Sequence, residues 1–469
     1  MRRVETDYLI VGGGASAMAY VDALVEVSPD AECLVVDRRH APGGHWLDAY
    51  PFVRLHQPSA NYGVSSRMLG GDRIDTHGAN TGFYERATGV EICDYFRQVL
   101  DDHLIPTGQV RFLGMTEYIG GDDGLHRLVS VASGEQTEVL VRRRVVDATY
   151  VESSIPSRHR PSFGMDEGAN VVPPNELVHL ASAPSGFTVL GGGKTAMDTC
   201  GWLLDQGVDP ERICWVRPSE LWLFNRAKTQ PLDLVGSYMQ LQASWVAASA
   251  TATDPIDFAR RLEAEDVFLR IDPGQEGAVF RGATISLSEL DALRSIRDVR
   301  PARVRHVGTS AISTDAGDVA NDSGRVVVDC TAAGLRPAPP RPAFEDGRIT
   351  MQYLTLGYLC WSAALLAIVE AAPLTDHERN ALCPPVPFSG RISDVLYQAN
   401  AVLQGIAARG AVPEIAGWND ASRLNPAAGL GPRMQDHDVV DALGRIGGDV
   451  GGAFRNLQRL APLDRFPVA

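Results

Sequence analysis

Two glycine-rich turns in the chain share the same spacing of residues. Residues 12–17 read GGGASA, and residues 191–196 read GGGKTA. Both fit the pattern G-x-G-x-x-A, in which the first glycine makes a tight turn and the second lets backbone N–H groups approach a pyrophosphate. Each turn therefore predicts a site for a dinucleotide. The candidate binding residues in the turns are Gly12, Gly14, Ser16, Ala17, Gly191, Gly193, Lys194, Thr195 and Ala196.

The elements that would position these turns are visible on either side of them. Apolar runs of strand type, at residues 8–11 and 187–190, precede the turns, and apolar residues at helical spacing follow each one. In this order of strand, turn and helix, the helix N-terminus directs its partial positive charge at the bound anion. The sequence thus predicts an α/β fold with two Rossmann-like units.

A second strand follows each helix and ends in a charged residue. The run 33–36 ends at Asp37, and the run 213–216 ends at Arg217, at nearly the same distance from its turn. A carboxylate at this place accepts hydrogen bonds from a free ribose diol, whereas an arginine suits the 2′-phosphate of NADP. We therefore expect the first turn to bind FAD and the second to bind NADPH, with Arg226 adding to the second site. The alternative for Arg217 is a solvated surface charge.

The composition is that of a globular protein with an acidic surface. The 469 residues include 43 Lys and Arg against 58 Asp and Glu, which gives a formal net charge of −15, and 45% of the residues are hydrophobic. Excess negative charge repels phosphate backbones and anionic lipid headgroups. Nucleic acid and membranes are therefore not expected as partners.

The cysteines and the first residues bear on the cellular compartment of the protein, and one apolar run bears on whether it crosses a membrane. Seven cysteines form no CxxC pair and no metal-ligand spacing, which favours a reduced cytoplasmic setting and predicts no metal site. The first predicted strand begins too early to leave room for a cleavable signal segment. The run 354–371 contains polar residues and a glutamate, so a buried helix is expected there rather than a membrane span.

The two turns, with their acidic and basic strand ends, resemble those of the two-dinucleotide-binding-domain flavoproteins. That superfamily includes pyridine nucleotide-disulfide reductases and flavin-containing monooxygenases, and the resemblance runs from residue 8 to about residue 335. It implies an NADP-binding domain inserted into an FAD-binding domain. The expected division is 1–182 for the first part of the FAD domain, 183–330 for the NADP domain, and 331–469 for the rest of the FAD domain with a helical C-terminal region. Segments at 145–149 and 327–332 resemble the motifs at which such chains cross between domains, and the small-residue run 245–255 is expected to interrupt the NADP domain.

Two segments resemble flavin-contacting parts of the monooxygenases. Gly44, His45 and Trp46 match the end of a G-G-x-W stretch that lies along the flavin in those relatives. Leu55, His56 and Gln57 follow where the relatives pack residues against the flavin ring, so the resemblance makes them candidates for the flavin face, with His56 and Gln57 as candidate catalytic residues. For these two, a hydrogen-bonded packing role beside the cofactor is the open alternative. No cysteine pair stands where the disulfide reductases carry theirs, which excludes thiol–disulfide chemistry.

The chain departs from the monooxygenase pattern in two places. The linker 160–180 has Phe163 and Gly168 but no histidine at the distance of the F-x-G-x-x-x-H signature. No Gly-Asp pair opens the run 354–371, where Ser362 is a candidate helix N-cap. The resemblance implies an FAD-dependent, NADPH-consuming monooxygenase that adds oxygen to a heteroatom or carbonyl of a small molecule through a C4a-peroxyflavin. Two alternatives stay open: a dehydrogenase or reductase with a non-oxygen acceptor, which the missing histidine favours, and a flavin-binding sensor without catalysis.

Overall fold

The computed structural model describes residues 2–122 and 124–466, and its first sheet has eight strands. These are β1 (Arg2–Val11), β2 (Cys33–Val36), β3 (Val110–Leu113), β4 (Thr116–Asp122), β5 (Leu125–Ser130), β6 (Gln136–Asp147), β21 (Phe344–Glu345) and β22 (Arg348–Thr350). The main path through the sheet is β21-β22-β6-β1-β2-β3, and the antiparallel hairpin of β4 and β5 extends from β6. Strands β22, β6, β1, β2 and β3 are parallel, so a strand near residue 350 completes a sheet that begins at residue 2.

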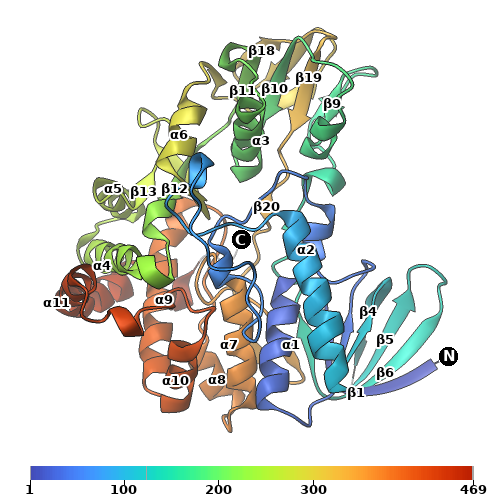
Figure 1. The fold of residues 1–469 in the computed structure, drawn as a ribbon, viewed down its shortest axis with the longest axis vertical. Coiled ribbons are helices and arrows are strands. Elements are labelled where there is room, and N and C mark those ends of the chain that lie inside the picture. The colour runs from blue at the N-terminus through green and yellow to red at the C-terminus, as the bar shows by residue number, and fades with distance from the viewer. Residues whose placement is uncertain (1, 123, 467–469) are drawn as a thin grey trace.

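Helices α1 (Ala15–Val27) and α7 (Leu359–Ala371) pack against each other beside this sheet (Figure 1). Helix α7 is buried along most of its 13 residues, which confirms the buried helix expected in the run 354–371. No helix within the described residues is both long enough and apolar enough to cross a membrane. The N-cap expected at Ser362 is wrong, because α7 begins at Leu359. The Ser362 hydroxyl instead donates to the Tyr358 carbonyl one turn earlier, at 2.8 Å.

The second sheet has five strands, all parallel. Its order is β15 (Asp298–Arg300), β11 (Ile213–Val216), β10 (Gly186–Leu190), β19 (Arg325–Asp329) and β9 (Val171–Val172). Helix α3 (Lys194–Asp205) follows β10 directly, and the group lies at the top of Figure 1. A small neighbouring sheet contains β18 (Gly317–Ala320), β17 (Ala311–Thr314), β16 (Val304–Val307) and β8 (Gly164–Met165). The predicted α/β fold with two Rossmann-like units is confirmed.

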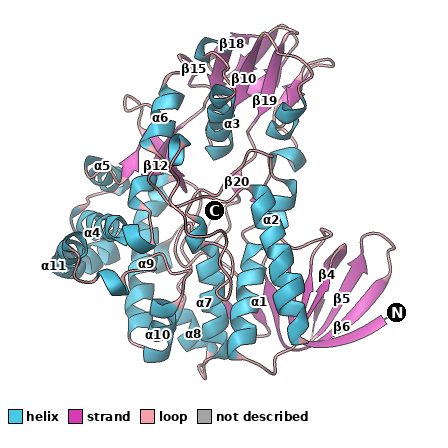
Figure 2. Cartoon of the chain, viewed as in Figure 1, coloured by secondary structure: helices cyan, strands magenta, loops and turns pink. Residues whose placement is uncertain are grey.

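The two segments by which the chain passes between these sheets pair with each other. Strand β7 (Ser153–Ser154) lies after the first sheet's β6, and β20 (Gly334–Leu335) lies after the second sheet's β19. The two form an antiparallel pair in which Gly334 faces Ser154 and Leu335 faces Ser153. The outgoing and returning chain therefore form one two-stranded ribbon between the upper and lower halves of Figure 2, where β20 is labelled.

A third region combines a segment of the middle of the chain with its C-terminal helices. The first part contains β12 (Glu220–Asn225), α4 (Val235–Thr251), α5 (Pro255–Ala264), β13 (Phe268–Leu269), β14 (Gly277–Ile285) and α6 (Leu287–Arg294). The second contains α8 (Asp376–Leu382), α9 (Val395–Gly410), α10 (Pro413–Ala421) and α11 (His437–Leu460). Helices α4 and α11 pack closely against each other at the side of the molecule (Figure 1).

The small residues of the run 245–255 lie mostly inside helix α4, which ends at Thr251 and belongs to the segment between β11 and β15 of the five-stranded sheet. Alanine has the highest helix propensity of the amino acids, which explains the continuous helix. Small side chains also let the neighbouring helix approach closely. A Cβ atom added to Gly452 of α11 would lie only 3.2 Å from the Cβ of Ala250.

Candidate functional site

The first glycine turn has the backbone geometry that its sequence predicts. Gly12 has φ +101°, and a Cβ atom there would lie 3.0 Å from Cγ2 of Thr149. Gly14 precedes α1 as its N-cap. Gly44 has φ +58°, and its added Cβ would lie 2.9 Å from the Cα of Gly14. The loop that carries Gly44 therefore packs backbone to backbone against the first turn.

Asp37 lies at the end of β2 and is bound to the same turn. Its Oδ2 accepts a hydrogen bond from the Gly13 N–H at 2.6 Å, and its Oδ1 accepts one from the Arg39 N–H at 2.7 Å. The residue is 7% exposed and lines a cavity. Each carboxylate oxygen still has lone-pair capacity for a further donor, as the predicted contact with a ribose requires.

The second glycine turn is held against the loop that follows the first. Lys194 begins α3 and forms an ion pair with Asp198, one helical turn later. The Tyr50 hydroxyl donates to Asp198 Oδ2 at 2.8 Å. Phe52 stacks on Trp202 of α3, with ring centroids 4.8 Å apart and planes 16° apart. These contacts join the segment 50–52 to α3 and bring the two turns toward one space.

That space is a cavity of about 440 Å³, within the range of roughly 300–1,000 Å³ typical of ligand sites. It brings together most of the predicted site residues. Those that line it are Gly12, Gly14, Ser16, Asp37, Gly44, His45, Trp46, Leu55, His56, Gln57, Gly193, Lys194 and Thr195. Those that do not are Ala17, Gly191, Ala196, Arg217 and Arg226. The two alanines are fully buried in the packing between helix and strand.

The two histidines of the cavity are held in the neutral form. Burial, assisted by the nearby charge of Lys194, lowers the pKa of His56 to about 4. Burial and the charge of Arg39 likewise lower the pKa of His45 to about 4. Near neutral pH both imidazoles can therefore donate and accept hydrogen bonds without carrying charge. The Gln57 side chain donates to the Asn61 carbonyl at 3.2 Å.

The two arginines expected beside the second turn have other partners. Arg226 is 0% exposed, and its guanidinium lies 2.6 Å from Glu289 Oε2, while Arg86 lies 3.2 Å from the other oxygen of the same carboxylate. Burial alone would disfavour the charge on Glu289, but Lys194, Arg226 and Arg86 together hold its pKa well below the usual range. Arg217 is buried beside Glu220, so it is not a solvated surface charge.

Sequence reasoning missed the apolar part of the cavity, which comes from the third region and the segment just before α7. Its residues include Leu221, Phe224, Tyr238, Leu241, Trp245, Phe280, Leu356, Tyr358 and Val402. Their only sequence signal is the helical spacing of apolar residues in α4. Arg281 of β14 also lines the cavity. It donates to the Ala333 carbonyl, its Nε has no hydrogen-bond partner in the described part of the chain, and burial lowers its pKa.

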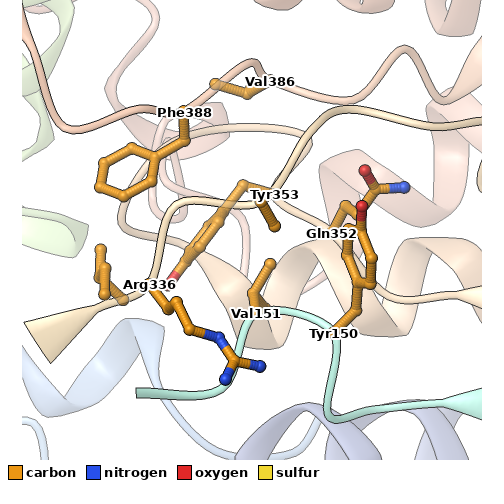
Figure 3. Close-up of a pocket in the computed structure, with 9 residues that line it drawn as sticks. Tyr150, Val151, Arg336, Gln352, Tyr353, Val386 and Phe388 are labelled. Atoms are coloured by element: carbon orange, nitrogen blue, oxygen red, sulfur yellow. The ribbon is translucent and has the colours of Figure 1, made fainter. Parts of the chain in front are cut away.

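A much smaller cavity adjoins the main one at the ribbon of β7 and β20 (Figure 3). Its volume of about 10 Å³ is close to the smallest that holds a single water molecule. Val151, Leu335, Tyr353 and Val386 line both cavities. This small cavity is therefore a packing gap beside the main site and is too small for a substrate.

Comparisons with known proteins place the chain among relatives. No protein-family model matches it. It is 39% identical over 435 residues to an uncharacterized protein of Mycobacterium tuberculosis (strain ATCC 25618 / H37Rv), a match that covers 92% of this chain and 80% of that protein. An uncharacterized protein of Mycobacterium bovis (strain ATCC BAA-935 / AF2122/97) matches with the same identity and coverage.

Solved structures share the fold at low sequence identity. The open crystal structure of cyclohexanone monooxygenase matches with a TM-score of 0.51 and 13% identity, over 88% of this chain and 99% of that one. A steroid monooxygenase bound to NADP matches with a TM-score of 0.50 and 13% identity, over 78% and 85% of the two chains. The resemblance predicted from the glycine turns is thereby confirmed for the fold. The chain belongs to the family of the two mycobacterial proteins, and it has the fold of the two-dinucleotide-binding-domain flavoproteins.

Proposed function

We propose that the protein is an FAD-dependent oxidoreductase that consumes NADPH and acts as a monooxygenase on a small molecule. One observation carries the proposal: residues of both glycine turns and a wall of apolar side chains line the same cavity. A flavin at the first turn and a nicotinamide from the second would meet there beside an apolar substrate. The structures bound to NADP, or to FAD and NADP, among the neighbours of similar fold are consistent with this pair of cofactors.

The residues at both turns fit dinucleotide phosphates. No atom lies within 4 Å of the place where a Cβ of Gly193 would stand, so the backbone there is open to a ligand. Gly14 and Gly193 precede helices of 13 and 12 residues, whose N-terminal N–H groups and dipoles favour an anion. Lys194 would add a positive charge at the second turn. Bound FAD would accept a hydride from NADPH and pass electrons to oxygen, chemistry that side chains do not supply.

The protein's own contribution would be to orient the reactants and keep water out. Apolar side chains of β12, α4 and β14 exclude water from the substrate end, which strengthens each electrostatic interaction inside. Arg281 would place a fixed positive charge at that end, where it can stabilise negative charge that develops in the reaction. His56 and Gln57, both uncharged, would provide hydrogen bonds beside the flavin rather than act as ion-pair partners.

We also propose the domain division at 1–182, 183–330 and 331–469. The first and third segments contribute β1 and β22 to one sheet, and the middle segment contributes β10 and β19 to the other. The short strands β8 and β9 precede residue 183 yet pair with strands of the middle segment, so the end of the first segment already contributes to the sheets of the second.

The molecule that accepts electrons from the reduced flavin distinguishes a monooxygenase from a reductase, and this acceptor can be identified by experiment. We would follow NADPH oxidation by the FAD-loaded protein with a panel of apolar amines, sulfides and ketones under isotopically labelled oxygen. Substrate-stimulated oxidation with one labelled oxygen atom in the product supports the monooxygenase. Flavin reduction with release of hydrogen peroxide and an unlabelled product supports a reductase, which the missing linker histidine favours. A flavin that NADPH does not reduce supports a sensor.

A further inference from the structure

Arg217 stands at the end of β11, where a dinucleotide's adenosine ribose lies in this arrangement of strand, turn and helix. Its aliphatic part touches the second turn, since a Cβ atom on Gly192 would lie 3.1 Å from Cγ of Arg217. The side chain is thus in the right place to contact a 2′-phosphate. Its charge, however, already has a partner.

That partner is Glu220. One guanidinium nitrogen of Arg217 lies 2.5 Å from Glu220 Oε2, and the two side chains are 3% and 0% exposed. The guanidinium also lies over the ring of Trp215, 5.1 Å from its centroid. Because both groups are withdrawn from water, solvent screens their interaction much less than that of a surface pair.

Glu220 is itself fixed in place by the backbone. Its Oε1 accepts a hydrogen bond from the Ile271 N–H at 2.8 Å, and its Oε2 accepts one from the Asp272 N–H at 3.2 Å. Burial is the largest influence and raises the pKa of Glu220, whereas the charge of Arg217 and these N–H donors favour the ionised carboxylate. The carboxylate therefore cannot swing away from Arg217 without leaving the buried Ile271 donor and the half-buried Asp272 donor unpaired, which is costly.

The neighbouring arginine at this edge is also neutralised. Arg300 of β15 lies across from Val216, and its Nε is 2.5 Å from Asp298 Oδ1. Each arginine at the ends of β11 and β15 thus has a carboxylate of its own. The Arg300 side chain is 56% exposed against 3% for Arg217, so solvent screens its ion pair and only the Arg217 pair is buried beside the second turn.

We propose that Glu220 determines the coenzyme specificity of the second turn. It neutralises Arg217 and repels a 2′-phosphate, so that NADPH and NADH bind with affinities within about tenfold of each other. This inference rests on the proposed function, because it assumes that the second turn binds a nicotinamide dinucleotide. Glu220 thus adds repulsion of the 2′-phosphate to a site in which Arg217 is the attractive residue. Specific binding sites commonly combine attraction with repulsion.

The experiment measures dissociation constants of NADP⁺ and NAD⁺ for the FAD-loaded full-length protein by titration calorimetry. Three variants accompany the wild type: Glu220→Gln, the double variant Arg217→Gln with Glu220→Gln, and Asp298→Asn. Glutamine at 220 keeps an acceptor for the buried N–H groups while it removes the charge. The Asp298→Asn variant is the matched control, since it frees the more exposed Arg300 instead.

We expect Glu220→Gln to shift the affinity ratio toward NADP⁺ by at least about tenfold, or about 1.4 kcal/mol. The double variant should return the ratio to the wild-type value, and Asp298→Asn should change it by less than about threefold. A smaller shift for Glu220→Gln overturns the inference, as does retention of the shift in the double variant. A wild-type preference for NADP⁺ above about tenfold overturns it as well, whether or not the variants fold.

The same protein separates this inference from the proposed function. Anaerobic mixing with NADPH or NADH shows whether either coenzyme reduces the flavin. If the coenzymes bind with the expected ratios but reduce no flavin, the proposed function fails and the assignment of Glu220 stands. If flavin reduction occurs and the ratios do not shift, only the assignment of Glu220 fails. If neither coenzyme binds, both fail.

Discussion

The close contact between Gly44 and the first glycine turn makes a specific prediction for FAD binding. Substitution Gly44→Ala would place a Cβ atom 2.9 Å from the Cα of Gly14, a distance at which backbone must move. Gly44 also has φ +58°, a left-handed conformation that costs alanine about 1–2 kcal/mol. The contact displaces the turn whose N–H groups we expect to bind the FAD phosphates. Loss of one charge-assisted hydrogen bond, worth about 1.5–3 kcal/mol, weakens FAD binding about tenfold to a hundredfold.

The matched control is Gly108→Ala. Gly108 has φ +77°, so alanine there has a similar backbone cost, but no atom lies within 4 Å of the added Cβ. Both variants should lose thermal stability as apoproteins, and Gly44→Ala should lose more because it adds the contact with Gly14 to the shared backbone cost. Only Gly44→Ala should weaken FAD binding, measured by quenching of flavin fluorescence during titration of the apoprotein. A folded Gly44→Ala variant that binds FAD like the wild type, or an equal loss in Gly108→Ala, would refute the reasoning.

Three further predictions follow from the site. Lys194→Met should weaken NADP⁺ binding about tenfold, because it removes a cation from the second turn. Calorimetry should find the FAD affinity unchanged. An equal loss of affinity for both ligands would contradict separate sites. Glu289→Ala should lower the free energy of unfolding in urea by about 3–5 kcal/mol, because two arginines lose their carboxylate partner. The control Glu276→Ala, in an exposed ion pair, should lower it by under about 1 kcal/mol. Similar losses in both variants would argue against a buried cluster around Glu289. The third concerns His56, whose folded pKa of about 4 lies below the unfolded value near 6.5, so the unfolded chain binds the extra proton and stability falls as pH decreases between those values. Between pH 7 and pH 5, His56→Gln should therefore lose about 2 kcal/mol less free energy of unfolding in urea than the wild type, and equal losses would show that His56 is not held neutral.

The parts of the site that the sequence predicts are those that depend on neighbouring residues in the chain. The two turns are recognisable because strand, glycine pattern and helix follow each other within a few residues, and the backbone needs glycine at Gly12 and Gly191, with φ +101° and +127°. Asp37 is predictable for the same reason, because it directly follows β2, the next strand in the chain. Such local signals survive in a single sequence.

The parts that could not be predicted depend on contacts between distant segments. Arg226 follows the second turn in sequence, yet Glu289 of α6, which also pairs with Arg86 from the first domain's loop region, draws it into a buried cluster. Arg217 has the predicted position, but its partner Glu220 is fixed by N–H groups some fifty residues later. The apolar end of the cavity needs α4, β14 and α9 together, and no periodic pattern in one of them indicates a shared surface.

The pairing of β22 with β6, and of α7 with α1, has a consequence for the order in which the chain folds. During synthesis the second sheet, from β9 to β19, is complete before residue 348 is made, whereas the first sheet still lacks β22 and the helix that covers α1. At roughly 5–20 residues per second, about 10 to 45 s separate the end of β6 from the end of α7. The second sheet can thus finish folding while the domain of the first sheet still lacks α7, which leaves an apolar face of α1 uncovered. We therefore expect that face to depend on protection by the ribosome or a chaperone during translation.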